Sequence, residues 1–437
     1  MKTYEKVTDL NKWIPLNMII KKAGRILFVW PPSHYLNHSL FKHFTYFGET
    51  VSVLSEHGFD LDVIDCGVEI FSRRMLFNKM HGARYLVMPL ELYNAKTGIS
   101  LARIFKDFIP EGKVITYGTA SSLIPNYISA SGVVDYIVPD GNFVIGILSA
   151  LFNDLTDKKS GRSSIMNVRD PEVRCAKPLL LGEELWGTAL NGLLPLKEYR
   201  RFGDGMFEIT MQVGCPWNCS FCSEKRLFPD FATQYRSINN AIAALRRIEA
   251  DGWKAVYLSA TTFTYDKDYV KRLCKAISDN GIGINWRAIT RVDMVNREII
   301  ELMAASGLRW LSIGVETFQP EIQAAINKKI EIQRIRDVVN LCNDVGVKPR
   351  ALLMIGLPGQ NAEIIANTYM ELKEMGADVR MKEYYPIQEI SLLDKVDVNK
   401  VEHKLGNFER LAYRTDSVSG LSKNQYMNYL FPADFMR

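Results

Sequence analysis

The sequence predicts an α/β protein, with a Rossmann/flavodoxin-like N-terminal lobe followed by a partial (β/α)6 TIM-like barrel. Short, continuously apolar runs alternate with amphipathic stretches of helical length, in two series separated by a polar segment. The 437 residues also exceed one ordinary hydrophobic core. We therefore expect a lobe over residues 1–155, a linker over 156–205, a barrel over 206–395 and a C-terminal extension over 396–437.

The first series of apolar runs predicts five parallel strands. Continuous apolar strands joined by helices form sheets that are covered on both faces, and such sheets bind ligands beyond the carboxyl ends of their strands. Small residues follow the fourth run, among them Gly118, Thr119 and Ser121, so these are candidate ligand contacts. The five runs are Arg25–Trp30, Asp60–Asp65, Arg84–Met88, Lys113–Tyr117 and Val134–Val138.

The second series predicts six further strands. Ser237 is suited to begin the helix after the first of them, because its hydroxyl can accept from a free backbone N–H. Six βα units form a partial barrel, whose active site lies at the loops that follow the strands. The runs are Glu208–Val213, Ala255–Ser259, Ile284–Ala288, Trp310–Val315, Arg350–Ile355 and Val379–Tyr384.

Composition and charge exclude several classes of protein. Hydrophobic residues make up 47% and charged residues 24%, as in soluble globular proteins, and no apolar run is long enough to cross a membrane. The N-terminus has no apolar core of a secretory signal, so we expect a cytoplasmic protein. The net charge of +5 is spread along the chain with acidic residues in between, which predicts no nucleic-acid partner.

The seven cysteines predict metal ligands rather than disulfides, because their number is odd and three of them are bunched together. Cys274 and Cys342 each share a helical face with apolar residues, so we expect both in the core. Cys66 and Cys175 receive no role.

The three bunched cysteines are Cys215, Cys219 and Cys222, directly after the first barrel strand. Thiolates at this spacing can hold three irons of a four-iron cluster and leave the fourth iron open. The alternative is a zinc site. Zinc usually takes four protein ligands in a structural site, and no other Cys or His lies within 30 residues on either side.

This triplet at the end of a first barrel strand resembles the radical S-adenosylmethionine (SAM) superfamily, over about residues 205–390. The resemblance implies a 4Fe-4S cluster, SAM bound to its open iron and a 5'-deoxyadenosyl radical. Arg291, or second Arg287, would hold the SAM carboxylate, Glu316 the ribose hydroxyls, and Phe221 would lie near the adenine. The alternative for Gly356 is a tight turn. The implied SAM contacts are Phe221, Ser259, Thr262, Arg287, Arg291, Glu316, Met354 and Gly356.

A flavodoxin-like lobe ahead of such a barrel is similar to the cobalamin-binding subgroup of this superfamily. That resemblance implies cobalamin, with Gly118, Thr119 and Ser121 giving it room, and methylation of an unactivated carbon in a small-molecule or peptide substrate. It also implies an electron donor such as flavodoxin or ferredoxin. Three histidines, His34, His38 and His43, follow the first strand. Each of them could face cobalt or have only a structural role, and the sequence leaves both possibilities open.

Two other functions remain open. One is a radical SAM cyclase, rearranging enzyme or epimerase whose cobalamin domain is degenerate. The other is a non-catalytic iron-sulfur or zinc module that regulates a partner. No residue is assigned as a catalytic acid or base, because radical chemistry does not require one.

Overall fold

The computed structural model describes residues 5–32, 44–69, 72–156, 165–168, 179–202, 205–228 and 233–409. The chain divides into two compact units: residues 1–205, 223–232 and 389–409 form the first, and residues 206–222, 233–388 and 410–437 the second. The domain boundaries expected from the sequence stay a prediction. Within the described ranges, no helix is long and apolar enough to cross a membrane.

The first unit is built on a six-stranded sheet in the order β3-β2-β4-β5-β6-β7. The first five strands are parallel, and β7 pairs antiparallel with β6 at the edge. This is the flavodoxin-like order, in which the second strand precedes the first across the sheet. The strands are β2 (Arg25–Trp30), β3 (Leu61–Asp65), β4 (Ala83–Pro89), β5 (Lys113–Tyr117), β6 (Tyr136–Ile137) and β7 (Met166–Asn167), and a separate parallel pair joins β1 (Glu5–Val7) to β8 (Leu179–Leu181).

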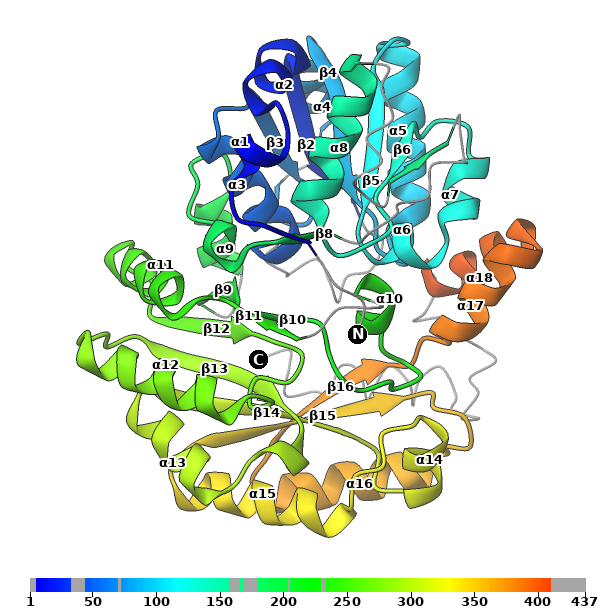
Figure 1. The fold of residues 1–437 in the computed structure, drawn as a ribbon. Coiled ribbons are helices and arrows are strands. Elements are labelled where there is room, and N and C mark those ends of the chain that lie inside the picture. The colour runs from blue at the N-terminus through cyan, green and yellow to red at the C-terminus, as the bar shows by residue number, and fades with distance from the viewer. Residues whose placement is uncertain are drawn as a thin grey trace. The chain divides into compact units, whose positions relative to one another are not determined.

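Helices cover both faces of this sheet, as Figure 1 shows. The helices α2, α3 and α8 pack together, and α4 contacts α5 through the rings of Phe77 and Phe108, whose centroids are 5.2 Å apart. Strands between two helical layers must be apolar throughout. The helices are α1 (Leu10–Trp13), α2 (Leu16–Ala23), α3 (Glu49–Glu56), α4 (Arg73–Met80), α5 (Ala95–Phe108), α6 (Thr119–Leu123), α7 (Pro125–Ala130), α8 (Phe143–Thr156), α9 (Leu196–Phe202), α10 (Glu224–Leu227), α17 (Ile387–Val396) and α18 (Val398–Glu409).

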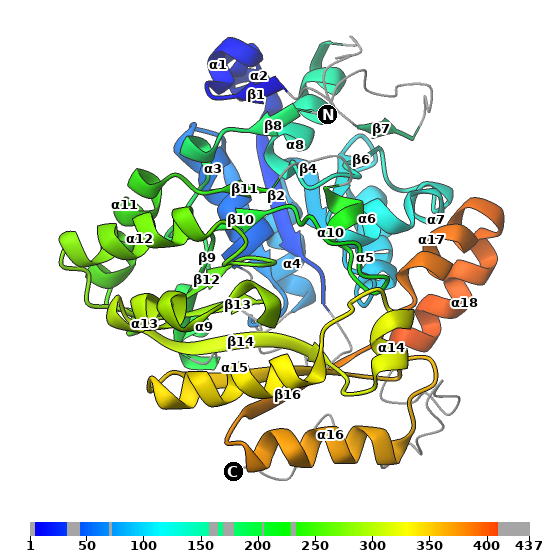
Figure 2. The ribbon, with the colours of Figure 1, turned by 60° about the horizontal axis from the view of Figure 1, so that its bottom comes forward.

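The second unit is a curved, fully parallel sheet in the order β16-β15-β14-β13-β12-β9. Its helices lie along the outer side of the curve, as Figure 2 shows. The predicted fold class, a Rossmann/flavodoxin-like lobe and a partial (β/α)6 barrel, is confirmed. The elements are β9 (Met206–Thr210), α11 (Ile238–Ala250), β12 (Ala255–Ser259), α12 (Lys267–Asp279), β13 (Asn285–Thr290), α13 (Arg297–Ala305), β14 (Leu308–Glu316), α14 (Pro320–Ala325), α15 (Ile332–Asp344), β15 (Lys348–Ile355), α16 (Ala362–Glu374) and β16 (Asp378–Glu383).

The first barrel strand differs from its prediction. The sequence predicts one strand over Glu208–Val213, but β9 ends at Thr210, and the next residues form β10 (Gln212–Val213). The strand β10 leaves the barrel sheet and pairs antiparallel with β11 (Gln234–Tyr235). The cysteine loop therefore follows a short hairpin strand.

Other local predictions are confirmed. Ser237 is the N-cap of α11, and its hydroxyl accepts from the Asn240 N–H at 3.3 Å. Cys274 and Cys342 are buried on helices α12 and α15.

Candidate functional site

The cysteine loop begins at Gly214, whose φ of +75° favours glycine. The three thiols of Cys215, Cys219 and Cys222 are half-buried. The Cys222 N–H donates to the Cys219 carbonyl at 3.2 Å, and the Ser220 N–H donates to the Ile326 carbonyl at 3.0 Å. These bonds curl the loop and attach it to the segment that follows α14.

Arg291 lies beside the loop. Its Nη1 is 3.9 Å from Cys219 Sγ, and its guanidinium carbon is 4.2 Å from the centre of the Trp217 ring. Asp293 accepts two hydrogen bonds from the same guanidinium, at 3.0 and 2.9 Å, which holds it in a buried position. Desolvation raises the pKa of the Cys219 thiol, while the cations of Lys328 and Arg291 oppose that rise. Arg291 is thus placed to favour a thiolate at Cys219.

A buried ion pair joins Glu316, at the end of β14, to Lys328. Lys328 Nζ donates to Glu316 Oε1 at 2.7 Å, and both side chains are less than one tenth exposed. Glu316 has a φ of +63°, an uncommon conformation for a non-glycine residue and one that clusters at functional sites. A Cβ on Gly314 would lie 2.4 Å from Lys328 Nζ, so a side chain there would displace the pair from its present position.

Phe221 and Met354 belong to one apolar cluster. Phe221 and Tyr384 pack against a core of Ile322, Ile326, Met354 and Leu357. Lys328 Nζ lies 5.8 Å from the centre of the Phe221 ring, at the edge of this cluster. An apolar surface with a few polar groups at its rim is the usual environment for a flat, heterocyclic ligand.

Gly356 lies in a tight turn after β15. Its φ is +86°, and its N–H donates to Gln360 Oε1 at 3.1 Å. Gln360 Nε2 donates in return to the Met354 carbonyl at 3.0 Å. The backbone N–H of Gly356 therefore already has a partner inside the protein.

The remaining predicted SAM contacts lie in different places. Thr262 Oγ1 is 3.9 Å from Cys215 Sγ, and the Thr262 N–H donates to Gln212 Oε1 at 2.9 Å. Ser259 is half-buried at the end of β12. Arg287 lies within β13, and its guanidinium carbon is 4.0 Å from the centre of the Tyr257 ring. The structure therefore brings Arg291 and Thr262 to the cysteines and gives Arg287 a separate contact.

Sequence reasoning missed Lys328 and Gln212. Lys328 follows α14 in a segment where Asn327 and Lys329 both have positive φ. No motif marks that segment. Its contact with Glu316 depends on a loop that returns to the end of β14, so only the folded chain reveals it.

The chemistry of this site fits an iron-sulfur cluster. A four-iron cluster can take thiolates on three of its irons and leave the fourth iron open, and three half-buried thiols with cations beside one of them fit that pattern. Over the residues that the structure describes, no three His, Cys, Asp or Glu side chains are gathered as they would be around one metal ion.

The predicted cobalamin contacts lie at the carboxyl edge of the first unit's sheet. Gly118 has a φ of +94°, and a Cβ there would lie 3.0 Å from the Leu90 carbonyl oxygen. Gly118 is therefore required by the packing of two loops. The Thr119 N–H contacts Glu91 Oε1 at 3.5 Å, and burial raises the pKa of Glu91 to about 7.

Three buried hydroxyls at this edge lack hydrogen bonds. Thr116 Oγ1, the Tyr117 hydroxyl and Ser121 Oγ are inaccessible to solvent and have no partner among the described residues. A buried hydroxyl without a partner is costly, so each such group calls for an explanation. Ser121 lies in α6, which begins directly after Gly118, so its hydroxyl fits a polar ligand that approaches this end of the sheet. The candidates His34, His38 and His43 lie outside the described residues.

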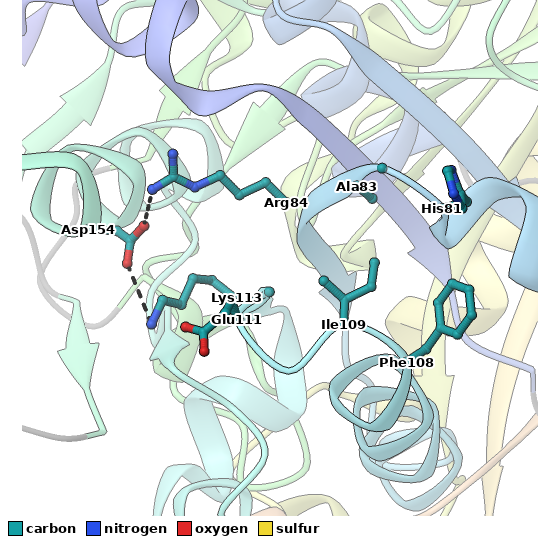
Figure 3. A pocket seen from close by; sticks show the side chains of 10 residues that line it. His81, Ala83, Arg84, Phe108, Ile109, Glu111, Lys113 and Asp154 are labelled. Atoms are coloured by element: carbon teal, nitrogen blue, oxygen red, sulfur yellow. Dashed lines mark hydrogen bonds and ion pairs between the residues drawn. The ribbon is translucent and has the colours of Figure 1, made fainter.

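A pocket of about 600 Å³ lies at the amino ends of the strands of the same sheet. It is lined by the first residues of β4 and β5, and Figure 3 shows Arg84 and Lys113 both reaching Asp154, at 3.3 and 3.9 Å. Parallel sheets bind ligands at the carboxyl ends of their strands, so this pocket is not the predicted cofactor site.

Comparisons with known proteins agree with this geometry. Residues 209–372 match the family model of the radical SAM superfamily. An uncharacterized methyltransferase of Pyrococcus horikoshii is 28% identical over 189 residues, which cover 43% of this chain and 40% of the relative. The anaerobic magnesium-protoporphyrin IX monomethyl ester cyclase of Rubrivivax gelatinosus is 25% identical over 193 residues, covering 42% of this chain and 34% of the relative. The chain thus spans less than half the length of these relatives.

Among solved structures, the radical SAM methyltransferase TsrM from Kitasatospora setae, with cobalamin and a [4Fe-4S] cluster bound, superimposes with a TM-score of 0.64. The match has 15% sequence identity and covers 82% of this chain and 74% of that one. At this identity the likeness establishes the fold. The chain therefore contains a domain of the radical SAM superfamily, set in a fold that it shares with a radical SAM methyltransferase whose solved structure holds cobalamin and a [4Fe-4S] cluster.

Proposed function

We propose that this protein is a cobalamin-dependent radical SAM methyltransferase that methylates an unactivated carbon of a small-molecule or peptide substrate. The observation that supports this proposal best is that one chain contains two candidate ligand-binding sites. The radical SAM domain has three half-buried thiols, one of them beside a buried cation, and the flavodoxin-like unit has buried hydroxyls that lack partners among the described residues.

Different residues would bind the different cofactors. Cys215, Cys219 and Cys222 would hold the cluster, with Arg291 offsetting their negative charge. Phe221 would contact the adenine of SAM. When bound, the cluster and SAM supply a 5'-deoxyadenosyl radical that removes hydrogen from a strong C–H bond, and cobalamin supplies the methyl group.

Glu316 would accept hydrogen bonds from the ribose hydroxyls of SAM. Its positive φ and its bond to Lys328 fix the carboxylate in one orientation before any ligand arrives. Lys328 Nζ donates a charge-assisted hydrogen bond to one oxygen of this carboxylate at 2.7 Å, and hydrogen bonds of that kind are stronger than neutral ones. The pair is thus a positioning device for a hydroxylated ligand.

Gly118, Thr119 and Ser121 would contact cobalamin. The hydroxyls of Ser121 and Tyr117 are buried and have no partner in the part of the chain that the structure describes, so a polar group of the ligand would satisfy them. An electron donor such as flavodoxin or ferredoxin would reduce the cluster.

The test uses anaerobically reconstituted protein, supplied with hydroxocobalamin, SAM and a reductant. We expect about one equivalent of corrinoid after desalting, and deoxyadenosine in the reaction mixture. Deuterium from methyl-labelled SAM should then appear in the corrinoid fraction. A protein that cleaves no SAM under these conditions would instead be a non-catalytic iron-sulfur module.

The cyclase, rearranging enzyme or epimerase remains the alternative, supported by the relative that is named a cyclase. Normal deoxyadenosine production without retained corrinoid would select it. Retention of corrinoid without transfer of label would exclude methyl transfer but keep the radical SAM assignment.

A further inference from the structure

The guanidinium of Arg291 has most of its hydrogen-bond donors occupied by oxygen atoms of the protein. A guanidinium has five N–H donors. Arg291 Nε donates to Asp293 Oδ1 at 3.0 Å, and Nη2 donates to Asp293 Oδ2 at 2.9 Å and to the Lys328 carbonyl at 3.1 Å. The two N–H groups of Nη1 remain, and within the described ranges the polar contact of this nitrogen is Cys219 Sγ at 3.9 Å.

This arrangement argues against Arg291 as the residue that holds the SAM carboxylate. A carboxylate is recognised best by two parallel hydrogen bonds from two nitrogens on one edge of a guanidinium. Asp293 already takes the edge formed by Nε and Nη2. The other edge shares Nη2, whose second N–H bonds to the Lys328 carbonyl. Arg291 therefore has no edge free for a second carboxylate, and its remaining nitrogen lies beside a sulfur atom.

A short segment after α14 holds Arg291 and the cysteine loop together. Asn327 Nδ2 donates to the Asn218 carbonyl of the loop at 2.8 Å, and the carbonyl of the next residue, Lys328, accepts from Arg291. Asn327 has a φ of +56°, a conformation in which asparagine is enriched. The spacing between the guanidinium and the loop is thus set by the protein itself, before any cluster is bound.

Trp217 covers one face of the guanidinium. The centre of its ring is 4.2 Å from the guanidinium carbon of Arg291, a distance typical of stacking. Arg291 is only 6% exposed. A charge in such a place is weakly screened, so it acts on a neighbouring thiolate more strongly than an exposed arginine would.

The indole N–H of Trp217 lacks an acceptor. Trp217 Nε1 is inaccessible to solvent, and it has no hydrogen-bond partner in the part of the chain that the structure describes. A buried donor without an acceptor costs free energy and calls for an explanation. Trp217 stands between Cys215 and Cys219 in the sequence, so a sulfur atom of the cluster is the acceptor that this loop would bring near.

Donors and positive charge beside the sulfur atoms raise the reduction potential of an iron-sulfur cluster. Reduction adds one electron, so the cluster becomes more negative by one charge. A cation or an N–H group at a sulfur therefore stabilises the reduced form more than the oxidised form. The electron comes from the donor protein, and no covalent bond forms or breaks in this step.

We propose that Arg291 and Trp217 set the reduction potential of the cluster. Arg291 Nη1 donates to the sulfur of Cys219, while Trp217 holds the guanidinium by stacking and donates its indole N–H to a sulfur of the cluster. This proposal rests on the cluster assigned under the proposed function, and it gives both residues to electron transfer rather than to SAM. Their effect is a cluster that accepts an electron more readily from its donor.

The test measures the midpoint potential of the cluster in the whole chain, reconstituted without SAM or cobalamin. A redox titration with dithionite, followed by the EPR signal of the reduced cluster, gives this potential. The variants are Arg291→Gln and Trp217→Phe. In the second variant an aromatic ring still stacks on the guanidinium, and only the N–H is lost. All preparations compared have the full iron and sulfide content.

Each variant has a matched control. Arg297→Gln removes the same charge from an exposed site on α13, where Arg297 pairs with Asp344 at 3.1 Å. Trp253→Phe removes an indole N–H that already has an acceptor, Asp251 Oδ2 at 3.0 Å, ahead of β12. Both controls should keep the midpoint potential of the wild-type protein.

We expect Arg291→Gln to lower the midpoint potential by about 59 mV, which corresponds to a tenfold change in the equilibrium of a one-electron reduction. Trp217→Phe should lower it by less, about threefold in the same equilibrium, because a neutral donor is lost. Calorimetric titration should give both variants the SAM affinity of the wild-type protein. If Arg291→Gln does not hold a full cluster, Arg291→Lys replaces it and should give a smaller shift in the same direction, since an ammonium keeps the charge but not the fork geometry.

Three outcomes would count against the proposal. Midpoint potentials that stay unchanged in both variants would overturn it. Weaker SAM binding by Arg291→Gln at an unchanged potential would also overturn it, and would return Arg291 to the SAM carboxylate. A shift in the Arg291 variant alone would remove the indole N–H from the assignment. None of these outcomes touches the proposed function, which fails only if the wild-type protein makes no deoxyadenosine.

Discussion

The two sheets of this protein are built from the same alternation of strands and helices, but their strands are buried in different ways. In the first unit, Ile26, Leu27, Phe28 and Val29 of β2 are successive residues that are all fully buried. In the barrel, β13 alternates strictly between buried and half-buried side chains. A sheet with helices on both faces must be apolar at every position, whereas a barrel wall has one helical side and one side for a ligand. The first arrangement stabilises the lobe and confines its ligand to the ends of the strands. The second lets side chains along the whole length of a strand contact a ligand.

The largest expected effect is the loss of the cluster when the cysteine loop of the barrel is changed. Replacing Cys215, Cys219 and Cys222 together with Ala should abolish the cluster, because all its protein thiolates are lost. Iron and sulfide analysis after anaerobic reconstitution gives the result. Cys342→Ala is the control: it should keep the full iron content and cost only about 1 kcal/mol of stability as a small core cavity. Iron that persists in the triple variant would contradict the assignment.

The second effect concerns the buried pair in the barrel. Glu316→Gln should weaken SAM binding by about 2–3 kcal/mol, roughly 30- to 150-fold, because charge-assisted hydrogen bonds become neutral ones. Gln is preferred to Ala, since its amide oxygen can still accept the hydrogen bond from Lys328 and leaves no cavity. Calorimetric titration with SAM measures the change.

The matched control for this pair is Glu321→Gln, which lies exposed in the first turn of α14. It should bind SAM as the wild type does. Equal SAM affinity in the Glu316 variant would remove that residue from the site.

The third effect concerns Glu91, which follows β4 at the carboxyl ends of the first unit's strands. Burial raises the pKa of Glu91 from 4.5 to about 7, so the folded protein holds a proton that the unfolded chain releases. Stability should therefore fall as the pH rises from 4.5 to about 7, by on the order of 2 kcal/mol in cobalamin-free protein. Denaturant unfolding across this range measures it. In Glu91→Gln most of the dependence should vanish, and an unchanged slope would assign it to other groups.

The smallest expected effect concerns the buried hydroxyls of the first sheet that have no partner within the described ranges. Tyr117→Phe should raise the stability of cobalamin-free protein by about 1 kcal/mol, because a buried group without a partner is removed. Tyr85→Phe is the matched variant with the opposite sign, since the Tyr85 hydroxyl donates to Asp154 at 2.6 Å. The two midpoints of urea unfolding should move in opposite directions. The Tyr117→Phe variant should also retain less corrinoid, which separates a ligand contact from a packing defect.

Several features could be predicted from the chain alone because they depend on neighbours in sequence. The strands β2, β5 and β12 have the bounds that their apolar runs predicted. The cysteine triplet needs only its spacing to suggest a cluster, because its ligands are contributed by one loop. The same reasoning failed for Glu208–Val213, since the break after Thr210 depends on where β11 returns to pair with β10.

The separation of Arg287 from Arg291 required the tertiary structure. Both arginines stand near the end of one strand in the sequence, and both suit a carboxylate ligand. Their partners, Tyr257 for one and Asp293 with Trp217 for the other, decide which direction each side chain takes. Of these, only Asp293 is close in the sequence.

The sequence by itself therefore determined the fold class, the order of the two βα series and the three thiols, because periodicity and short spacing are local properties. The tertiary structure decided what surrounds those thiols. It brought Lys328 to Glu316, and it left the hydroxyls of Thr116, Tyr117 and Ser121 without partners among the described residues. Each of these depends on strand register and on loops that return from distant parts of the chain, and side-chain direction across a sheet reverses with a shift of one residue.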